Sequence, residues 1–381
     1  MPALVVGLGY GATACAPRPA APVRAPATDE VAIGVLVPNR PGMAAVAQGA
    51  QLALDVLRTD PHARAAGVRF SLRVTPPSVA SAVAAAERLR DDPAVLGIVG
   101  DAESGRTLDA LPIVEDAAGG GARAVVAVTP TATSPALAGR SPWLFRLSPS
   151  DDVASRHVAG YVRDSLGSRR AAVVYRADSY GRDWAAAFVR AYSTGGGVVV
   201  ARDPYLHGVT EWPAYARALA AARPDVVLFP GAASDAADFL RALRAAGVRV
   251  PLVGGDAVAP LADSAEFAGT RYAATFTADR ASAPGAPAAA RAFVARYQAR
   301  FGERPGVRAA LGYEATLLLG QAALAVDRAA PDRRRRVRDH LAALGRSAPA
   351  AAGLVGPIAF DTAHGVAARG VIVATVPGRA P

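Results

Sequence analysis

The sequence contains no lysine and only one cysteine, and 6% of its 381 residues are aromatic. A single cysteine excludes an internal disulfide framework. The five histidines lack metal-ligand spacing and no G-x-S-x-G motif is present, so we expect neither a metal or other cofactor nor an enzyme of these classes. A charged fraction of 19% against 52% hydrophobic residues excludes a disordered chain.

The net charge of +10 comes from arginines scattered along the chain. A basic balance is compatible with nucleic-acid or membrane-surface partners, which bind through clustered charge. The only run of arginines, residues 333–336, begins a predicted helix, and we interpret it as a solvated helix face rather than a polyanion site. No nucleic-acid partner is therefore expected.

The N-terminal segment has the layout of an export signal. Residues 1–14 are apolar and end in the small residues Ala12, Thr13 and Ala14, and residues 15–28 form a Pro/Ala-rich tether. Cys15 directly follows the predicted cleavage site, which is the position of the lipid-modified cysteine in a lipoprotein box. No basic residue precedes Cys15, which is compatible with a start codon further upstream. The G-x-G-x-x-A pattern in residues 7–12 is not a nucleotide site, because prolines interrupt the helix that it needs.

The rest of the chain alternates apolar strands with helices, which predicts an α/β fold with parallel sheets covered on both faces. A lone strand at 143–147 leads into a second series of strands and helices, and 272–277 leads back to a block of helices. We therefore expect two discontinuous domains. Lobe 1 comprises 29–146 plus 277–353, and lobe 2 comprises 147–276 plus 354–381.

Two small polar loops follow neighbouring predicted strands. Residues 101–105 follow the strand 95–99, and residues 130–134 follow the strand 124–129. Ligands of open α/β sheets bind beyond the carboxyl ends of the strands, where hydroxyls and free amides hold anions. The loops predict a cradle for a carboxylate or phosphate. Ser104 is equally compatible with a plain helix N-cap.

Several segments, in this order and spacing, resemble the leucine/isoleucine/valine-binding family of type I periplasmic binding proteins. The segments are 31–38, 97–100 with Ser104, 128–135 (VTPTATSP), 143–147 (WLFRL), 171–175, 178–181 (DSYG), 225–229, 253–256 (VGGD) and 356–361 (GPIAFD). The resemblance covers residues 30–376. It implies two doubly wound parallel-sheet lobes joined by a three-segment hinge that closes over a ligand.

The resemblance also implies roles for individual residues. Ser104, Thr131 and Thr133 would hold the ligand's α-carboxylate, Thr131 through its backbone and Thr133 also through its hydroxyl. Asp256 stands where the family usually has a glutamate for the ammonium group. Tyr180 matches a tyrosine that closes over the ligand, although it is also compatible with plain packing at a helix start.

Two positions depart from the family's side-chain pocket. Val46 stands where an aromatic residue is usual, and Ala232 stands where a tyrosine follows the strand 225–229. Both changes remove bulk, so we expect a pocket unlike that for leucine. Arg40 lies in the first loop, where it either pairs with an acidic ligand or is exposed to solvent.

The sequence thus predicts an extracytoplasmic solute-binding protein, not an enzyme. It would capture an amino acid, of branched-chain type or a related small zwitterion, between its lobes for an ABC importer. The expected partners are the transporter permease and, through Cys15, the membrane, with a periplasmic or cell-surface location. The alternative is a ligand sensor or protein-interaction module on the same scaffold.

Overall fold

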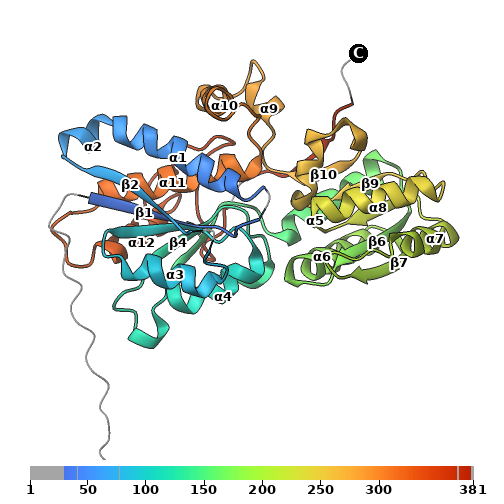
Figure 1. Cartoon of the computed structure of the whole chain (residues 1–381), viewed down its shortest axis with the longest axis horizontal. Helices are drawn as coiled ribbons and strands as arrows, with labels where there is room; N and C mark the ends of the chain where they lie inside the picture. Colours follow the sequence, from blue (N-terminus) through green and yellow to red (C-terminus); the bar gives the residue numbers. More distant parts are fainter. Residues whose placement is uncertain (1–29, 41, 77, 367–368, 379–381) are drawn as a thin grey trace, which may run out of the picture.

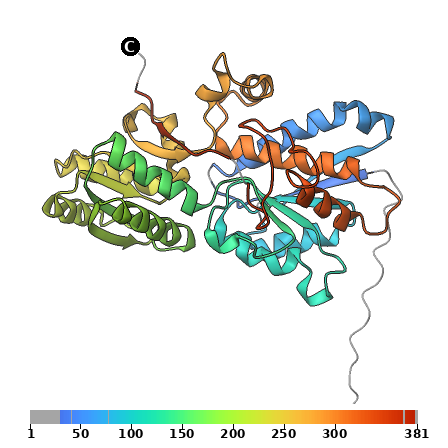
Figure 2. The same cartoon turned by 180° about the vertical axis from the view of Figure 1, so that it is seen from behind.

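The protein consists of two α/β lobes that lie side by side in the computed structural model, which describes residues 30–40, 42–76, 78–366 and 369–378 (Figure 1). The predicted signal segment, the tether and Cys15 lie outside the described residues. Helices cover both faces of the sheet in each lobe, as the view from behind also shows (Figure 2). In the described part of the chain, no helix combines the length and apolar character needed to cross a membrane.

The first lobe is built on a sheet of five strands that all pair in parallel. In spatial order the strands are β2 (Arg69–Val74), β1 (Glu30–Leu36), β3 (Val95–Gly100), β4 (Val126–Thr129) and β5 (Leu144–Arg146). Every residue of β3, β4 and β5 is buried. This burial explains why β3 and the first three residues of β4 form continuous apolar runs in the sequence rather than alternating patterns, while β5 includes the buried Arg146.

Two layers of helices cover this sheet. One face carries α1 (Ala44–Thr59), α11 (Val307–Ala325) and α12 (Arg333–Ala343), and the other carries α3 (Ala82–Asp91) and α4 (Ser104–Val114). The lobe also contains the short α2 (Pro61–Ala65) and α9 (Ala278–Ser282), and α10 (Ala288–Phe301). Helices α1 and α11 pack so closely that a Cβ atom at Gly49 would lie 2.0 Å from the Ala309 carbonyl oxygen. This contact fixes the first turn of α11.

The second lobe contains a six-stranded sheet. Its strands in spatial order are β11 (Ile372–Thr375), β10 (Arg271–Ala274), β9 (Leu252–Gly254), β8 (Val226–Phe229), β6 (Arg170–Arg176) and β7 (Val198–Tyr205). All pairs are parallel except β10 with β11, which is antiparallel. Helices α5 (Asp151–Gly160) and α6 (Ser179–Thr194) pack on one face, and α7 (Trp212–Ala222) and α8 (Ala233–Ala245) pack on the other. The predicted α/β architecture with two parallel-sheet lobes is confirmed, and β11 is its antiparallel exception.

The chain crosses between the lobes after β5, after β10 and before β11. The last crossing lies later than the sequence predicted, because residues 354–366 pack on the first lobe. Ile358 and Phe360 lie in its core, and the Phe360 ring meets that of Phe145 at 4.9 Å between centroids. Residues 358–360 form isolated bridges to Ala351 and Val366 rather than a strand of either sheet. The short helices α2 and α9 were not predicted.

Candidate ligand-binding cleft

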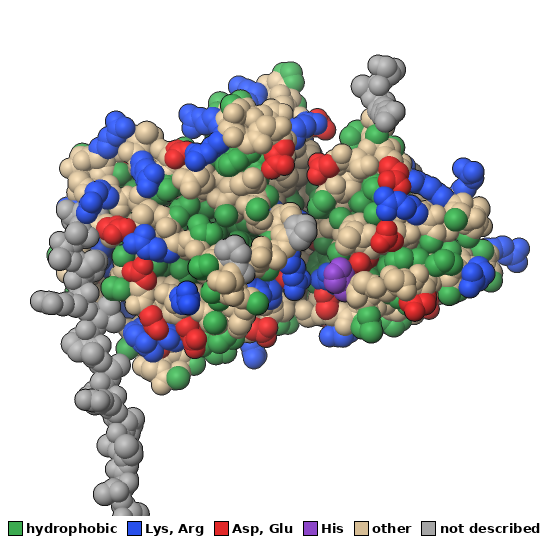
Figure 3. All heavy atoms as spheres, in the orientation of Figure 1, with side chains coloured by type: hydrophobic (Ala, Val, Ile, Leu, Met, Phe, Trp, Pro, Cys, Tyr) green, Lys and Arg blue, Asp and Glu red, His purple; other side chains and the backbone are tan. Residues whose placement is uncertain are grey.

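A cleft of about 1020 Å³ separates the two lobes, and both contribute to its walls (Figure 3). The first lobe supplies the loops that follow β1, β3 and β4, together with the first turn of α11. The second lobe supplies the segments that follow β6, β7, β8 and β9. The cleft therefore lies at the carboxyl ends of both sheets, where open α/β folds bind ligands.

Ser104 joins the two polar loops of the first-lobe wall. Its hydroxyl oxygen accepts the backbone N–H groups of Thr133 at 3.2 Å and Ser134 at 3.1 Å. The N-cap of α4 is Glu103, so Ser104 is not the capping residue that sequence reasoning left open. Within the described residues the Ser104 hydroxyl only accepts hydrogen bonds, which leaves its proton available to an anion in the cleft.

The two threonines of the second loop differ in the hydrogen bonds that their hydroxyls form. The Thr131 hydroxyl donates to the Ala102 carbonyl at 2.8 Å, and Thr131 lines the main cleft. The Thr133 hydroxyl is buried, forms no hydrogen bond of normal geometry among the described residues, and lies close enough to the Asp151 carboxyl to lower its pKa. Thr133 lines a smaller cavity next to the cleft, which also contains Asp256. The structure thus brings both threonines and Ser104 to one wall.

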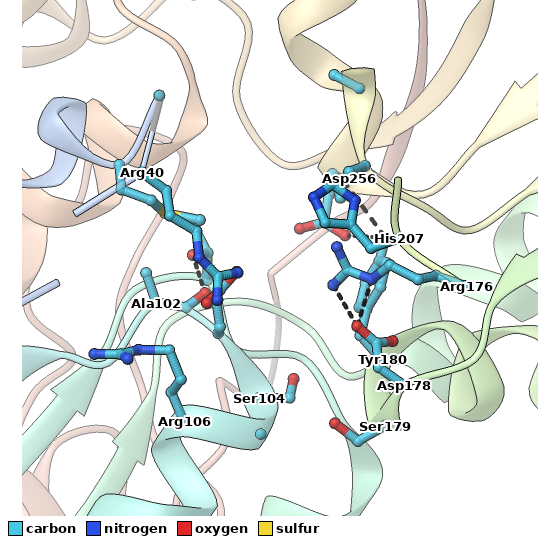
Figure 4. Close-up of a pocket in the computed structure, with 18 of the residues that line it drawn as sticks. Arg40, Ala102, Ser104, Arg106, Arg176, Asp178, Ser179, Tyr180, His207 and Asp256 are labelled. Atoms are coloured by element: carbon cyan, nitrogen blue, oxygen red, sulfur yellow. Dashed lines mark hydrogen bonds and ion pairs between the residues drawn. The ribbon is translucent and has the colours of Figure 1, made fainter. Parts of the chain in front are cut away.

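On the opposite wall, Tyr180 and Asp256 form a hydrogen-bonded pair. The Tyr180 hydroxyl donates to the Asp256 carboxylate at 3.0 Å, and both side chains line the cleft (Figure 4). A Cβ atom at Gly255 would lie 2.2 Å from the Tyr180 hydroxyl, so only glycine allows this approach. Burial raises the pKa of the Asp256 carboxyl, while the Tyr180 hydrogen bond and the charge of Arg308 oppose the rise.

A second carboxylate, Asp151, faces the smaller cavity. Asp151 is the first residue of α5, its side chain is fully buried, and neither carboxylate oxygen has a hydrogen-bond partner. Burial, followed by the charge of Asp256, holds the pKa of Asp151 well above its usual range. Two carboxyls that face one cavity with unused oxygens suit a cationic group.

Sequence reasoning missed Asp151. The Ser150-Asp151-Asp152 segment is typical of a solvated helix N-terminus. One feature of the sequence could have indicated its role. The acidic pair follows directly after the segment in which the chain crosses from β5 to the second lobe.

The three expected pocket residues have different positions. Arg40 lines the cleft, where it pairs with Glu103 at 3.0 Å, and Ala232 lines the opposite wall. Val46 is fully buried in the core between α1 and the first sheet, so the prediction that it lines the pocket is wrong. Its position on α1 faces the sheet, and Met43, one turn earlier, lines the cleft instead.

The lobes also touch at the base of the cleft. The Ser134 hydroxyl, from the loop after β4, hydrogen-bonds the Asp183 carboxylate on α6. No group of three or more His, Cys, Asp or Glu side chains that suits a metal ion occurs among the described residues. The first-lobe wall thus offers hydroxyls and amides, and the opposite wall offers the Asp256 carboxylate.

Three comparisons relate this chain to known proteins. A family model described as periplasmic binding protein matches residues 30–380. The chain is 27% identical over 232 residues to Leu/Ile/Val-binding protein homolog 3 of Brucella melitensis, which is 60% of this chain and 61% of that protein. It is 26% identical over 178 residues to an amino acid binding protein of Pseudomonas aeruginosa, which is 46% of each chain. The matched part therefore spans less than two thirds of either curated relative.

Solved structures share the fold over nearly the whole length. The substrate-binding protein LivJ of a branched-chain amino acid transporter from Streptococcus pneumoniae, in complex with isoleucine, has a TM-score of 0.78 at 22% identity and covers 91% of this chain and 96% of its own. A solute-binding protein from R. palustris in complex with benzoate has a TM-score of 0.75 at 18% identity. The match covers 92% of this chain and 94% of that protein. At such identities the likeness establishes the fold alone.

Proposed function

Because the chain belongs to the periplasmic binding protein family, we propose that it captures a free α-amino acid in the cleft between its lobes. The two ends of the amino acid are held separately, the carboxylate by the first lobe and the ammonium by the aspartates. The observation that carries this proposal is the pair of carboxylates, Asp151 and Asp256, which face one cavity beside a wall of hydroxyls and amides.

The carboxylate end is assigned to Ser104 and the loop after β4. The Ser104 hydroxyl accepts two amides and keeps its own proton for the ligand. The Thr131 hydroxyl is occupied by Ala102, so Thr131 acts through its backbone, whereas Thr133 offers an unpartnered hydroxyl. Hydrogen bonds to a charged acceptor are about twice as strong as neutral ones.

The ammonium end is assigned to Asp256 and Asp151. An ammonium group carries three donors and no acceptor, so it satisfies carboxylate oxygens that otherwise remain unpaired in a buried site. Tyr180 orients Asp256 through their hydrogen bond. Movement of the lobes about the three crossing segments then excludes water from the charged groups, which strengthens each interaction.

The same proposal includes export and delivery. Residues 1–14 would be an export signal and Cys15 a lipid attachment site, with residues 16–28 as a tether to the membrane surface. An ABC transporter permease is the partner that would receive the amino acid. The relatives named as amino acid binding proteins and as a transporter's substrate-binding protein support this part of the proposal.

Thermal unfolding tests amino acid capture. The chain is expressed from Ala16, refolded to remove carried-over ligand, and heated with amino acids, amides and small carboxylates. A ligand at about one hundred times its Kd stabilises the folded state by about 2.7 kcal/mol, which raises Tm by several degrees. A shift with one class of α-amino acid supports capture. No shift with any of them contradicts it and favours the sensor or protein-interaction alternative.

Substitution of Asp256 tests the assignment of the ammonium end. The variant Asp256→Ala should weaken binding of the amino acid by well over tenfold, because a buried ammonium loses its partner. The matched control is Asp238→Asn on the outer surface of α8, where the carboxylate pairs with the exposed Arg241. Unchanged affinity of the Asp256 variant, measured by isothermal titration calorimetry, contradicts the assignment.

A further inference from the structure

Four arginines line the cleft beside four carboxylates. Arg40, Arg106 and Arg308 come from the first lobe and Arg176 from the second. Among the described residues that line the cleft, Tyr180 is the only Phe, Tyr or Trp, the other ring is the His207 imidazole, and the aliphatic lining is limited to small side chains, Met43, Leu206 and Pro260. Such walls offer little packing to a branched aliphatic side chain, whose binding depends on buried apolar contact.

Three of these arginines already have carboxylate partners. Arg106 pairs with the buried Asp101 at 2.6 Å and donates to the Ala80 carbonyl at 2.7 Å. Figure 4 shows Arg106 extending away from the space between the lobes, while Arg40 and Arg176 lie on opposite sides of it. Arg40 pairs with Glu103, and Arg176 pairs with Asp178, which also caps α6. None of the three guanidinium groups lacks a counter-charge.

Arg308 is different. It lies in the first turn of α11, lines the cleft and has no hydrogen-bond or ion-pair partner within the described part of the chain. A Cβ atom at Gly42 would lie 3.4 Å from its Nη1 atom, so the guanidinium lies beside the loop that carries Arg40. The carboxylate that senses its charge is Asp256, whose pKa it lowers. The other unpaired carboxylate of the lining, Asp109, is exposed to solvent on α4.

Capture of an ammonium group changes the environment of Arg308. The ligand's ammonium neutralises Asp256, and closure of the lobes removes water from the cleft. Arg308 would then be enclosed without a carboxylate in hydrogen-bonding contact among the described residues, which is costly for a guanidinium. A ligand that brings its own second anion removes this cost.

We infer that the ligand is an α-amino acid whose side chain carries a carboxylate, and that Arg308 binds this carboxylate. This inference rests on the proposed function for the two main-chain ends of the ligand. The planar fork of a guanidinium matches a carboxylate with two parallel hydrogen bonds. Arg40, in the neighbouring loop, is already paired with Glu103, so Arg308 is the guanidinium of this wall whose fork is unused among the described residues.

Isothermal titration calorimetry with near-isosteric pairs tests the inference. The refolded protein is titrated with glutamate and glutamine, with aspartate and asparagine, and with leucine. We expect at least one acidic amino acid to bind at least tenfold more tightly than its amide and than leucine, because a charge-assisted pair replaces a desolvated, unpaired guanidinium.

Variants of Arg308 locate the preference. Arg308→Gln should weaken binding of the acidic amino acid more than tenfold and leave binding of its amide within about threefold, so that the preference disappears. Arg308→Lys keeps the charge without the fork and should retain part of the preference. Arg88→Gln, on an exposed site of α3 outside the cleft, is the matched control and should bind like the unmodified protein. Thermal unfolding of each variant checks that it is folded.

The outcomes separate this inference from the proposed function. Tighter binding of leucine or of an amide than of either acidic amino acid overturns the inference and leaves amino acid capture intact. An acidic preference that persists in Arg308→Gln overturns the role of Arg308. Glutarate binding as tightly as glutamate overturns the proposed ammonium site while supporting the arginine. Absence of binding by every α-amino acid overturns both.

Discussion

Asp151 and Asp256 are two carboxylates that face one small cavity beside the cleft. Burial raises the pKa of both carboxyls, so the empty protein holds them partly protonated at pH values where a solvated aspartate is ionised. The other charged or titratable groups that act on them are Asp183, Arg146, Tyr180 and Arg308. Ligand binding should therefore be linked to proton release.

The pH dependence of affinity follows from this linkage. The ammonium of the ligand favours ionised carboxylates, so protons must leave on binding, and affinity should fall as the pH is lowered through the raised pKa values. One linked proton changes the affinity by up to about tenfold per pH unit. Calorimetry between pH 5 and 8, in two buffers that differ in ionisation enthalpy, measures both effects. Affinity that is independent of pH, with no proton release, contradicts the carboxylate pair as the ammonium site.

Asp151→Asn separates binding from stability. The amide cannot compensate an ammonium charge, so affinity for the amino acid should fall at least tenfold. The empty protein should become more stable at pH 8, by about 1–3 kcal/mol, because the variant no longer buries an unpaired carboxylate. The direction of this change follows from the raised pKa of Asp151. As the pH rises above the pKa that the carboxyl has in the unfolded chain, its ionisation lowers the stability of the folded protein.

A neighbouring substitution controls this experiment. Asp152→Asn lies in the same helical turn, but its carboxylate pairs with Arg190 on α6 at 3.0 Å and is partly exposed. It should change neither the affinity nor the denaturation midpoint appreciably. If Asp151→Asn behaves like Asp152→Asn in both measurements, Asp151 has no part in the ammonium site.

The sequence predicted the site residues that follow strands but not those whose role depends on the meeting of two lobes. Ser104 and Thr131 follow β3 and β4 directly, so the end of each strand predicts their place at the cleft. Asp151 is the first residue of α5, and Arg308 lies in the first turn of α11. Their positions beside the cleft depend on the segments that cross between the lobes. Val46 was wrongly predicted to line the pocket. A resemblance indicates where a residue lies along the chain, but it does not show which face of the helix the side chain occupies.

At the scale of elements, α11 connects the cleft to the segment that returns to the second lobe. Its first turn carries Arg308, and Glu314, two turns later, is buried. The Glu314 carboxylate binds Arg369 at 2.7 Å, and both side chains are almost fully buried. Glu314 also accepts the Leu354 amide, so one carboxylate joins α11 to both ends of the 354–369 segment.

Glu314→Gln should therefore lower the free energy of unfolding by about 3–5 kcal/mol, because it leaves the buried Arg369 guanidinium without its charge partner. The control is Glu266→Gln, which removes an exposed pair with Arg241 and should cost less than about 1 kcal/mol. Chemical denaturation monitored by circular dichroism measures both. A loss below about 1 kcal/mol for Glu314→Gln would show that this pair does not hold the segment.

Hydrophobic periodicity predicted most elements to within a few residues, because their burial is set by the sheets. It did not predict α2 and α9, which have five residues each and bury little surface of their own. It assigned residues 358–360 to the second lobe, whereas they pack in the core of the first. Three apolar residues in a row do not indicate which of the two hydrophobic cores they join. Phe145, which meets Phe360, lies more than two hundred residues earlier.

At the scale of the whole molecule, two sheets joined by three crossings place their carboxyl ends on opposite sides of one cleft. In the proposed function each lobe supplies half of the site: hydroxyls, amides and Arg308 come from the first, and Tyr180 with Asp256 from the second. The central claim is that an α-amino acid bridges these halves through its two charged main-chain groups.

The most direct test compares an amino acid with the same molecule lacking one of these groups. The amino acid with the largest thermal shift is titrated into the refolded protein beside its deaminated and its decarboxylated analogues. The account predicts that each analogue binds at least a hundredfold more weakly, because each leaves buried polar groups of one wall unpaired. A deaminated analogue that binds as tightly as the amino acid would contradict the account.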